Sequence, residues 1–351
     1  MDLEKYSREL EIAVKAVHMA CLLCQRVQQS LLAKNNGHVQ SKDDDSPVTV
    51  ADWSVQAIVS WVLSEAFGSK NVSIVAEEDV QVLSKSDSIQ LLDTVTKTVN
   101  TSLAEAPCFG LRAPTAPLST SEVLEAISRC NSTGGSHGRF WVLDPVDGTL
   151  GFVRGDQYAI ALALIEGGEP VLGVLGCPNY PMNKEWLSYH NGYRRIISRL
   201  TSETSESWDK GCVIYARKGS GSAWMQPLLS KEKKFVWPNS ARHIKVSTID
   251  DPALATFCEP VEKANSSHSF TAGLAHSVGL RRRYGITLVL AGVVIIQEAG
   301  GVVTDAGGHP LCFSKGMYLE GLDRGIIVCS GARLHEKIIN AVDASWNSSS
   351  L

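Results

Sequence analysis

The chain has 351 residues, of which 44% are hydrophobic and 20% are charged, as in an ordinary soluble globular protein. Its 33 basic and 37 acidic side chains give a formal net charge of -4, and no long basic run occurs, so we expect no nucleic acid partner. No apolar run is long enough to span a membrane, and we expect no membrane insertion. The length suffices for one large domain or two subdomains with a substantial core.

The nine cysteines are odd in number and follow no disulfide-framework spacing, which favours a reduced intracellular compartment. The first residues carry acids early and resemble neither a signal nor a transit peptide, so we expect a cytoplasmic location. Cys21 and Cys24 have CxxC spacing inside an amphipathic helix pattern. We expect core packing there rather than redox or zinc chemistry, because no second Cys/His pair accompanies them.

Two helices are predicted in the first part of the chain. Apolar residues recur at three- and four-residue steps between residues 6 and 32, and a similar pattern follows residue 52. Asp52 lies near the start of this second helix. There it is either an acid favoured by the helix dipole or a carboxylate that accepts a proton from water.

Two apolar strands run directly into acidic residues. Residues 72–76 lead into Glu77, Glu78 and Asp79, and residues 141–143 lead into an Asp-Pro-x-Asp-Gly-Thr segment at 144–149. Ligands of layered α/β folds bind at strand ends, so acids repeated there favour a functional site. The alternative for each segment is an ordinary polar turn.

The 144–149 segment has the donors that a hard divalent cation prefers. Asp144 and Asp147 supply carboxylates, and the constrained turn can offer the carbonyl of Val146. Gly148 permits a close approach of a ligand, and the Thr149 hydroxyl can orient a water or contact a phosphate. We expect the preceding strand to end at this turn.

The remaining elements alternate between strands and helices. Ser119 and Glu122 form a capping box before one helix, and Gly167-Gly168 indicates a hairpin. Residues 151–157 are expected to connect the 144–149 turn to the first strand of that hairpin. The other predicted helices cover residues 89–103, 123–130, 270–278, 291–301 and 334–342, and the other predicted strands cover 158–166, 171–176, 212–216, 223–226, 244–247, 302–305 and 325–329.

Four segments together resemble one family. They are Ser-Pro-Val-Thr-Val-Ala-Asp (46–52), Val-Ala-Glu-Glu-Asp (75–79), Asp-Pro-Val-Asp-Gly-Thr (144–149) and Glu-Ala-Gly-Gly-Val-Val-Thr-Asp (298–305). They look like the lithium-sensitive, Mg²⁺-dependent phosphatases of the inositol monophosphatase superfamily. Ser-Pro-Val-Thr (46–49), Gly-Asp-Gln-Tyr (155–158) and Gly-Ser-Gly (219–221) are most similar to its plant 3′(2′),5′-bisphosphate nucleotidases.

The resemblance implies a layered α/β/α/β/α sandwich. We expect an N-terminal α+β subdomain at residues 1–155, with most metal ligands, and a C-terminal α/β subdomain at 156–351. The implied substrate is a small bisphosphate nucleotide, 3′-phosphoadenosine 5′-phosphate (PAP), which is hydrolysed to AMP and phosphate. The resemblance does not indicate the oligomeric state.

The resemblance also implies roles for individual residues. Mg²⁺ would be bound by Glu77, Asp144, Asp147 and the Val146 carbonyl, with Asp144 bridging two ions. Asp52 and Thr149 would activate the attacking water, and Gly148 and Thr149 would hold the phosphate. Asn265 appears at the place of a substrate-binding His of the family, and His268 lies close by. Two metal ions can clamp phosphoryl oxygens and lower the pKa of bound water.

One segment departs from the family pattern. Family members carry a Trp-Asp-His-Ala-Ala-Gly turn whose Asp binds the second metal, whereas residues 284–292 here contain no acid, and Leu288 is at the position of that Asp. A strand-rich, substrate-contacting segment between Leu280 and Tyr284 is missing too, so relative to the family the C-terminal subdomain is truncated between about residues 280 and 291. Residues 284–289 can be encoded by TAT GGG ATC ACG CTG GTN, and the same string read two nucleotides later gives Trp-Asp-His-Ala-Gly. We hypothesise a disturbed gene model or splice form.

Two alternatives to a PAP phosphatase stay open. The same metal core serves inositol polyphosphate 1-phosphatases and inositol monophosphatases. The missing acid also fits a catalytically impaired relative that binds bisphosphate nucleotides or a protein partner.

Overall fold

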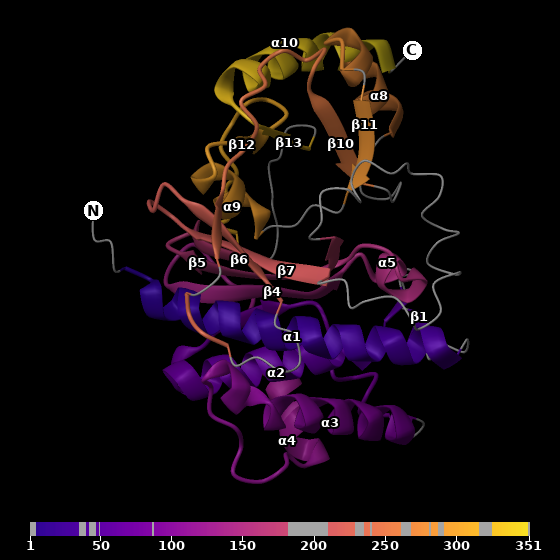
Figure 1. Ribbon diagram of the computed structural model, residues 1–351, viewed down its shortest axis with the longest axis vertical. Helices are drawn as coiled ribbons and strands as arrows, with labels where there is room; N and C mark the ends of the chain where they lie inside the picture. Colours follow the sequence, from indigo (N-terminus) through magenta and orange to yellow (C-terminus); the bar gives the residue numbers. More distant parts are fainter. Residues whose placement is uncertain are drawn as a thin grey trace.

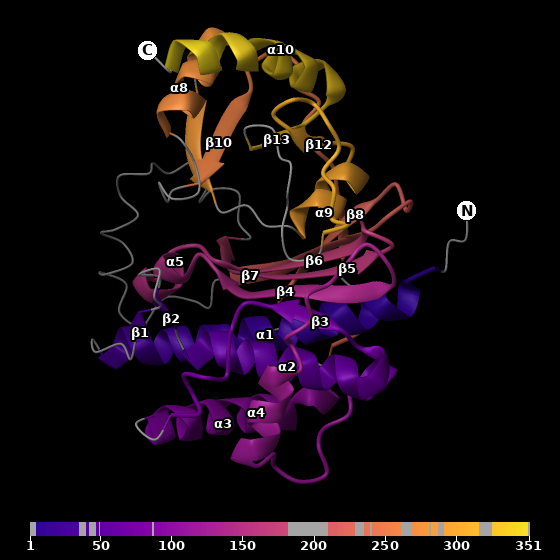
Figure 2. The same ribbon diagram turned by 180° about the vertical axis from the view of Figure 1, so that it is seen from behind.

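Helices and strands form successive layers along the long axis of the molecule (Figure 1). This computed structural model describes residues 5–34, 40–41, 47–48, 50–85, 88–181, 210–228, 235–238, 241–260, 268–280, 282–286, 291–315 and 325–349. A seven-stranded sheet lies in the middle with helices on both faces, and two small sheets and two more helices follow at one end. The view from behind shows the same order (Figure 2). The layered α/β/α/β/α arrangement predicted from the sequence is therefore confirmed.

The large sheet has the strand order β3-β4-β5-β6-β7-β8-β9. Only β3 and β4 are parallel, and every later pair is antiparallel. The predicted hairpin at Gly167-Gly168 joins β5 to β6, and both glycines have the positive φ that a tight hairpin turn requires (60° and 78°). The strands are β3 (Ile74–Ala76), β4 (Arg139–Asp147), β5 (Ala159–Glu166), β6 (Glu169–Pro181), β7 (Lys210–Arg217), β8 (Ala223–Pro227) and β9 (Arg242–Ile244).

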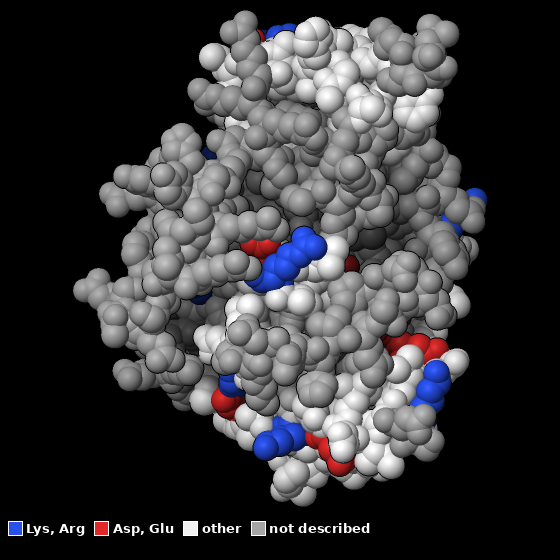
Figure 3. Space-filling model, turned by 90° about the vertical axis from the view of Figure 1, so that its right-hand side faces the viewer, with Lys and Arg blue, Asp and Glu red and all other residues white. Residues whose placement is uncertain are grey.

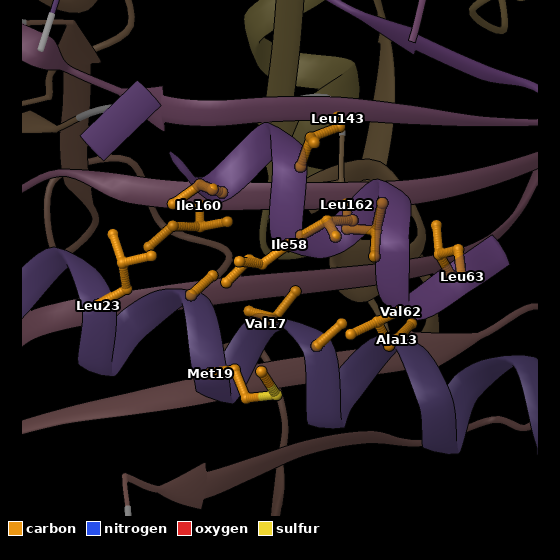
Figure 4. Packing of buried hydrophobic residues seen from close by; sticks show 14 of the residues in the cluster. Ala13, Val17, Met19, Leu23, Ile58, Val62, Leu63, Leu143, Ile160 and Leu162 are labelled. Carbon is orange, nitrogen blue, oxygen red and sulfur yellow. The ribbon is translucent and has the colours of Figure 1, made fainter. Parts of the chain in front are cut away.

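Two long helices, α1 (Ser7–Lys34) and α2 (Val50–Phe67), cover one face of this sheet. Figure 4 shows Val17 and Leu23 of α1 and Ile58 of α2 pointing toward Leu143 and Ile160 of the strands. These side chains are buried, and burying each aliphatic side chain contributes about 1.5–3 kcal/mol. Apolar burial against the sheet is therefore what holds the two predicted helices in place.

The cysteines of α1 belong to this core. Cys21 and Cys24 are fully buried, and burial raises the pKa of both thiols well above their usual range. The prediction of core packing at the CxxC spacing is confirmed. All nine cysteines of the chain are free.

A further pair of helices, α3 (Ile89–Ala104) and α4 (Thr120–Ser128), packs on the outer side of α2. The predicted capping box opens α4: the Ser119 side chain accepts a hydrogen bond from the Glu122 backbone N–H, and the Glu122 side chain accepts one from the Ser119 backbone N–H.

The opposite face of the sheet packs against α9 (Gly292–Glu298). Phe140 and Ile165 of the sheet bury against Val293 of α9 and Val303 of β12 (Val302–Asp305). Beyond α9 lie two two-stranded sheets, the antiparallel β12–β13 and the parallel β10–β11, and then the outer helices α8 and α10. Their bounds are β10 (Thr256–Pro260), α8 (His268–Ser277), β11 (Arg282–Ile286), β13 (Ile326–Cys329) and α10 (Ala332–Ser349).

The structure departs from the sequence prediction at several elements. Residues 149–154 form helix α5 (Thr149–Arg154), not a connecting loop, because tertiary contacts hold this short glycine-containing segment: Gln28 of α1 donates to the Phe152 carbonyl at 2.7 Å. Strands β10 and β11 were not predicted, and β9 begins two residues before the expected strand. Two short antiparallel strands that were not predicted, β1 (Gln40–Ser41) and β2 (Pro47–Val48), lie between the two predicted N-terminal helices.

The division at residues 155 and 156 stays a prediction, and the strands on its two sides, β4 and β5, pair within one sheet. Residues 182–209, between β6 and β7, lie outside the described residues. Within the described part of the chain, none of the helices has the length and apolar character needed to cross a membrane.

Candidate active site

The two acid-terminated strands are neighbours in the sheet. Strands β3 and β4 run parallel, and Ala76 is paired with Leu143. The next residues along the two strands are Glu77 and Asp144, so their main chains lie side by side at one edge of the sheet. The structure thus makes the two strands neighbours, whereas metal binding by the two acids stays a prediction.

Strand β4 does not end at Asp144, as the sequence suggested, but continues to Asp147. Asp144 pairs with Ala161 and Asp147 pairs with Ala159, so three steps on β4 match two steps on β5. This is the geometry of a β-bulge, which turns side chains away from the regular alternation and is frequent next to active sites. The turn-forming Asp-Pro pair is thus accommodated inside the strand as an irregularity. The Oδ2 atom of Asp147 is buried there.

Gly148 and Thr149 connect the bulged strand to α5. Gly148 has φ 84° and ψ 46°, a left-handed conformation that favours glycine, and it is the residue before the first turn of α5. The Thr149 hydroxyl donates to the Val146 carbonyl at 3.1 Å. A carbonyl oxygen has two acceptor sites, so this bond leaves one for a cation. The predicted phosphate-binding pair therefore lies beside the predicted carbonyl ligand.

Asp52 lies in the first turn of α2 and is 3% exposed. The carboxylate is therefore buried, and burial first and the negative charge of Asp52 second raise the pKa of Cys24 of α1. The Asp52 side chain therefore does not point into bulk solvent. A solvent-exposed Asp52 would have had only the role of an acid at the helix terminus. Its contact with Thr149 through a water stays a prediction.

Two residues of α2 that were not among the predicted site residues, Trp53 and Gln56, form hydrogen bonds with the main chain of the acidic segment at 77–79. The Gln56 side chain donates to the Glu78 carbonyl at 2.8 Å and accepts from the Glu78 N–H at 3.1 Å. Trp53 Nε1 donates to the Asp79 carbonyl at 3.3 Å. The available signal was a glutamine four residues after Asp52 in a helix that is otherwise mostly apolar, because buried polar side chains need specific partners.

For some of the predicted site residues, the structure does not describe the side chain. His268 is the first residue of α8, but its side chain, like Asn265 and Leu288, lies outside what the structure describes. Among the described residues, no three His, Cys, Asp or Glu side chains form a group that could hold a metal ion. The donor types suit a hard cation and the β3–β4 register brings them to one edge, so the convergence of the three carboxylates stays a prediction.

The Gly-Ser-Gly segment at 219–221 has a structural partner. Glu298 of α9 accepts hydrogen bonds from the N–H groups of Gly219 and Gly221 and from the Ser220 hydroxyl. The glutamate of the 298–305 segment thereby ties α9 to the β7–β8 turn. Two of the segments that carried the resemblance are thus in direct contact.

On the side of the molecule that carries α5, the described acidic side chains lie close to basic ones (Figure 3). The described residues on this side form no patch of purely positive or purely negative charge.

Comparison with known proteins identifies relatives along the whole chain. A model of the inositol monophosphatase family matches residues 7–347. The chain is 57% identical to a 3′,5′-bisphosphate nucleotidase of Arabidopsis thaliana, with 100% of both chains covered. It is 37% identical to a 3′(2′),5′-bisphosphate nucleotidase of Oryza sativa, covering 96% of this chain and 94% of the relative.

Solved structures show the same fold. An IMPase of Thermotoga maritima matches with a TM-score of 0.55 at 18% identity, covering 97% of this chain and 98% of the other. The suhB protein of Bartonella henselae matches with a TM-score of 0.52 at 17% identity, covering 94% and 96%. The family match, the bisphosphate nucleotidase relatives and the shared fold agree with one another. The chain belongs to the inositol monophosphatase family.

Proposed function

We propose that this chain is a 3′(2′),5′-bisphosphate nucleotidase that hydrolyses the 3′-phosphate of PAP to give AMP and phosphate. The observation that carries the proposal is the 57% identity over full length to a relative named as a 3′,5′-bisphosphate nucleotidase. The neighbouring acids Glu77, just after β3, and Asp144, within β4, supply chemistry suited to a phosphoric monoester hydrolase.

Mg²⁺ is the proposed cofactor, and relatives in this family are generally metal-dependent phosphatases. In this proposal Glu77, Asp144, Asp147 and the Val146 carbonyl hold the metal, which would neutralise phosphoryl charge and lower the pKa of a bound water. The support from the structure is the type of donor and the strand register.

The remaining residues act on water and substrate. Asp52 accepts the proton of the attacking water, and Thr149 orients that water through its hydroxyl. Gly148 and Thr149 hold the phosphate beside the β4 bulge, and His268 contacts the nucleotide. The buried position of Asp52 favours a base over a solvated helix-terminal acid.

An impaired relative is the second candidate, and the sequence at Leu288 favours it. No acid is present where the family has the second metal ligand. The alignment with the Arabidopsis relative covers 381 positions, 30 more than the 351 residues of this chain, which agrees with a missing internal segment. Such a protein would bind PAP with little turnover.

Phosphate release from PAP, inositol 1-phosphate and inositol 1,4-bisphosphate, with and without Mg²⁺, tests the proposal. We expect Mg²⁺-dependent release from PAP in preference to the inositol phosphates, and Asp144→Asn should abolish it without changing the circular dichroism spectrum. The exposed Asp251→Asn is the matched control. Preferred hydrolysis of an inositol phosphate would replace the proposal with the inositol phosphatase alternative, and PAP binding without turnover would establish the impaired relative.

Location and assembly are further proposals. The absence of disulfides among all nine cysteines supports a reducing compartment such as the cytoplasm. The proposed partner is a small bisphosphate nucleotide rather than a nucleic acid.

A further inference from the structure

We infer that Gln56 is a positioning residue that fixes the Glu77–Asp79 segment relative to Asp52 and so presents Glu77 to the metal. This inference rests on the proposed function, because it concerns the same site. It adds a residue that touches neither the substrate nor any predicted ligand side chain.

The Gln56 carboxamide is almost fully used in hydrogen bonds. Besides its two bonds to the Glu78 main chain, Nε2 also donates to the Ile127 carbonyl near the end of α4, at 3.2 Å. Both N–H donors and one acceptor site are therefore occupied. The side chain has an exposed fraction of 0%, and the reversed amide orientation would place oxygen against two carbonyls. The amide is thus held in one orientation.

The main chain at Glu78 needs the hydrogen bonds from Gln56 because it lies just beyond the last paired residue of β3. The Ala76 N–H still bonds the Cys130 carbonyl, and the β3–β4 pairing ends at Ala76. Glu78 lies beyond the end of the β3–β4 pairing and is buried, and buried backbone groups must be hydrogen-bonded. Gln56 satisfies both the N–H and the carbonyl of Glu78.

The hydrogen bonds from Gln56 to the Glu78 main chain determine which side chains of the 77–79 segment face outward. Glu78 is buried, whereas the residues on either side, Glu77 and Asp79, are exposed. With Gln56 drawing the Glu78 main chain against α2, Glu77 stays on the outer side, next to Asp144 in register. Asp52 and Gln56 are one helical turn apart and so share a face of α2. One helix therefore sets the position of both the proposed base and the first proposed ligand.

The test measures Mg²⁺ binding through the rise in melting temperature as Mg²⁺ is titrated, which does not depend on catalysis. In Gln56→Met, an apolar side chain of similar length, the half-saturating Mg²⁺ concentration should rise at least about tenfold, since about 1.4 kcal/mol is the size of one net hydrogen bond. Asn100→Leu is the matched control, because Asn100 makes the same two-bond contact with the Leu118 main chain, at 2.8 and 2.7 Å, away from the site. Its half-saturating concentration should equal that of the wild type.

Trp53→Phe keeps the result decisive should Gln56→Met fail to fold. It removes only the Nε1 bond to Asp79 and should raise the half-saturating concentration by about two- to fivefold, less than loss of a full net hydrogen bond gives. A wild-type value in Gln56→Met, or in Trp53→Phe where Gln56→Met does not fold, would overturn the inference while leaving the proposed function intact. A wild-type protein that Mg²⁺ does not stabilise would overturn the proposed metal use and the inference with it.

Discussion

Acid should destabilise this protein through His18, a buried residue of α1 outside the site. Its imidazole is fully buried and makes a T-shaped contact with the Phe235 ring, with 4.9 Å between the ring centroids. Among the described residues, neither ring nitrogen has a hydrogen-bond partner. Burial lowers the pKa of His18 from 6.5 to about 3, because the charged ring would be desolvated.

The direction of the effect follows from proton binding. The unfolded chain takes up a proton at His18 below about pH 6.5, while the folded chain resists it down to about pH 3. The stability is therefore fully present above pH 6.5 and is lost as the pH falls toward 3. At pH 4.5, two units below the unfolded pKa, this one residue should cost about 2.7 kcal/mol. That is a large part of a typical unfolding free energy of about 5–15 kcal/mol.

Urea unfolding at pH 7.5 and pH 4.5 measures this cost. His18→Leu should lose about 2.7 kcal/mol less than the wild type between the two pH values, because leucine takes up no proton. His276→Gln, an exposed histidine of α8, is the control and should behave as the wild type. Equal losses in wild type and His18→Leu would show that His18 is not the buried neutral group described above.

Three further predictions concern the site, the helix α4 and the segment at residues 284–292 that departs from the family pattern. Thr149→Val should lower the turnover of PAP by at least about tenfold in steady-state phosphate release, since it removes a hydroxyl proposed to act on the water. Ser119→Ala should lower the free energy of unfolding by about 1 kcal/mol in urea titration, because it removes the capping box of α4. Restoring the Trp-Asp-His turn and the segment before it should raise PAP hydrolysis at least about a hundredfold, equivalent to about 2.7 kcal/mol, and should improve solubility. A chain of the present sequence that is as active as the restored one would contradict the assignment of the missing acid at Leu288.

Much of the fold follows from local pattern. The helical period of α1 and α2, the capping box at Ser119 and the glycine pair of the β5–β6 hairpin each determine their element with residues close in sequence. The motifs at 75–79 and 144–149 are equally local, so the candidate ligands could be proposed from the sequence together with the resemblance.

Tertiary structure decided the rest, because the information lies in contacts between distant residues. The sequence predicted a turn at Asp144, but pairing with β5 carries the strand on to Asp147 through a bulge. Helix α5 is too short and glycine-containing to be stable alone, and a bond from Gln28, over a hundred residues earlier, holds it. The Gln56 contact shows the same limit: its helix position was predictable, but only packing of α2 against the end of β3 brings its amide to the Glu78 main chain. A local pattern determines which residues can form an element, whereas partners for buried polar groups are found only when the layers pack.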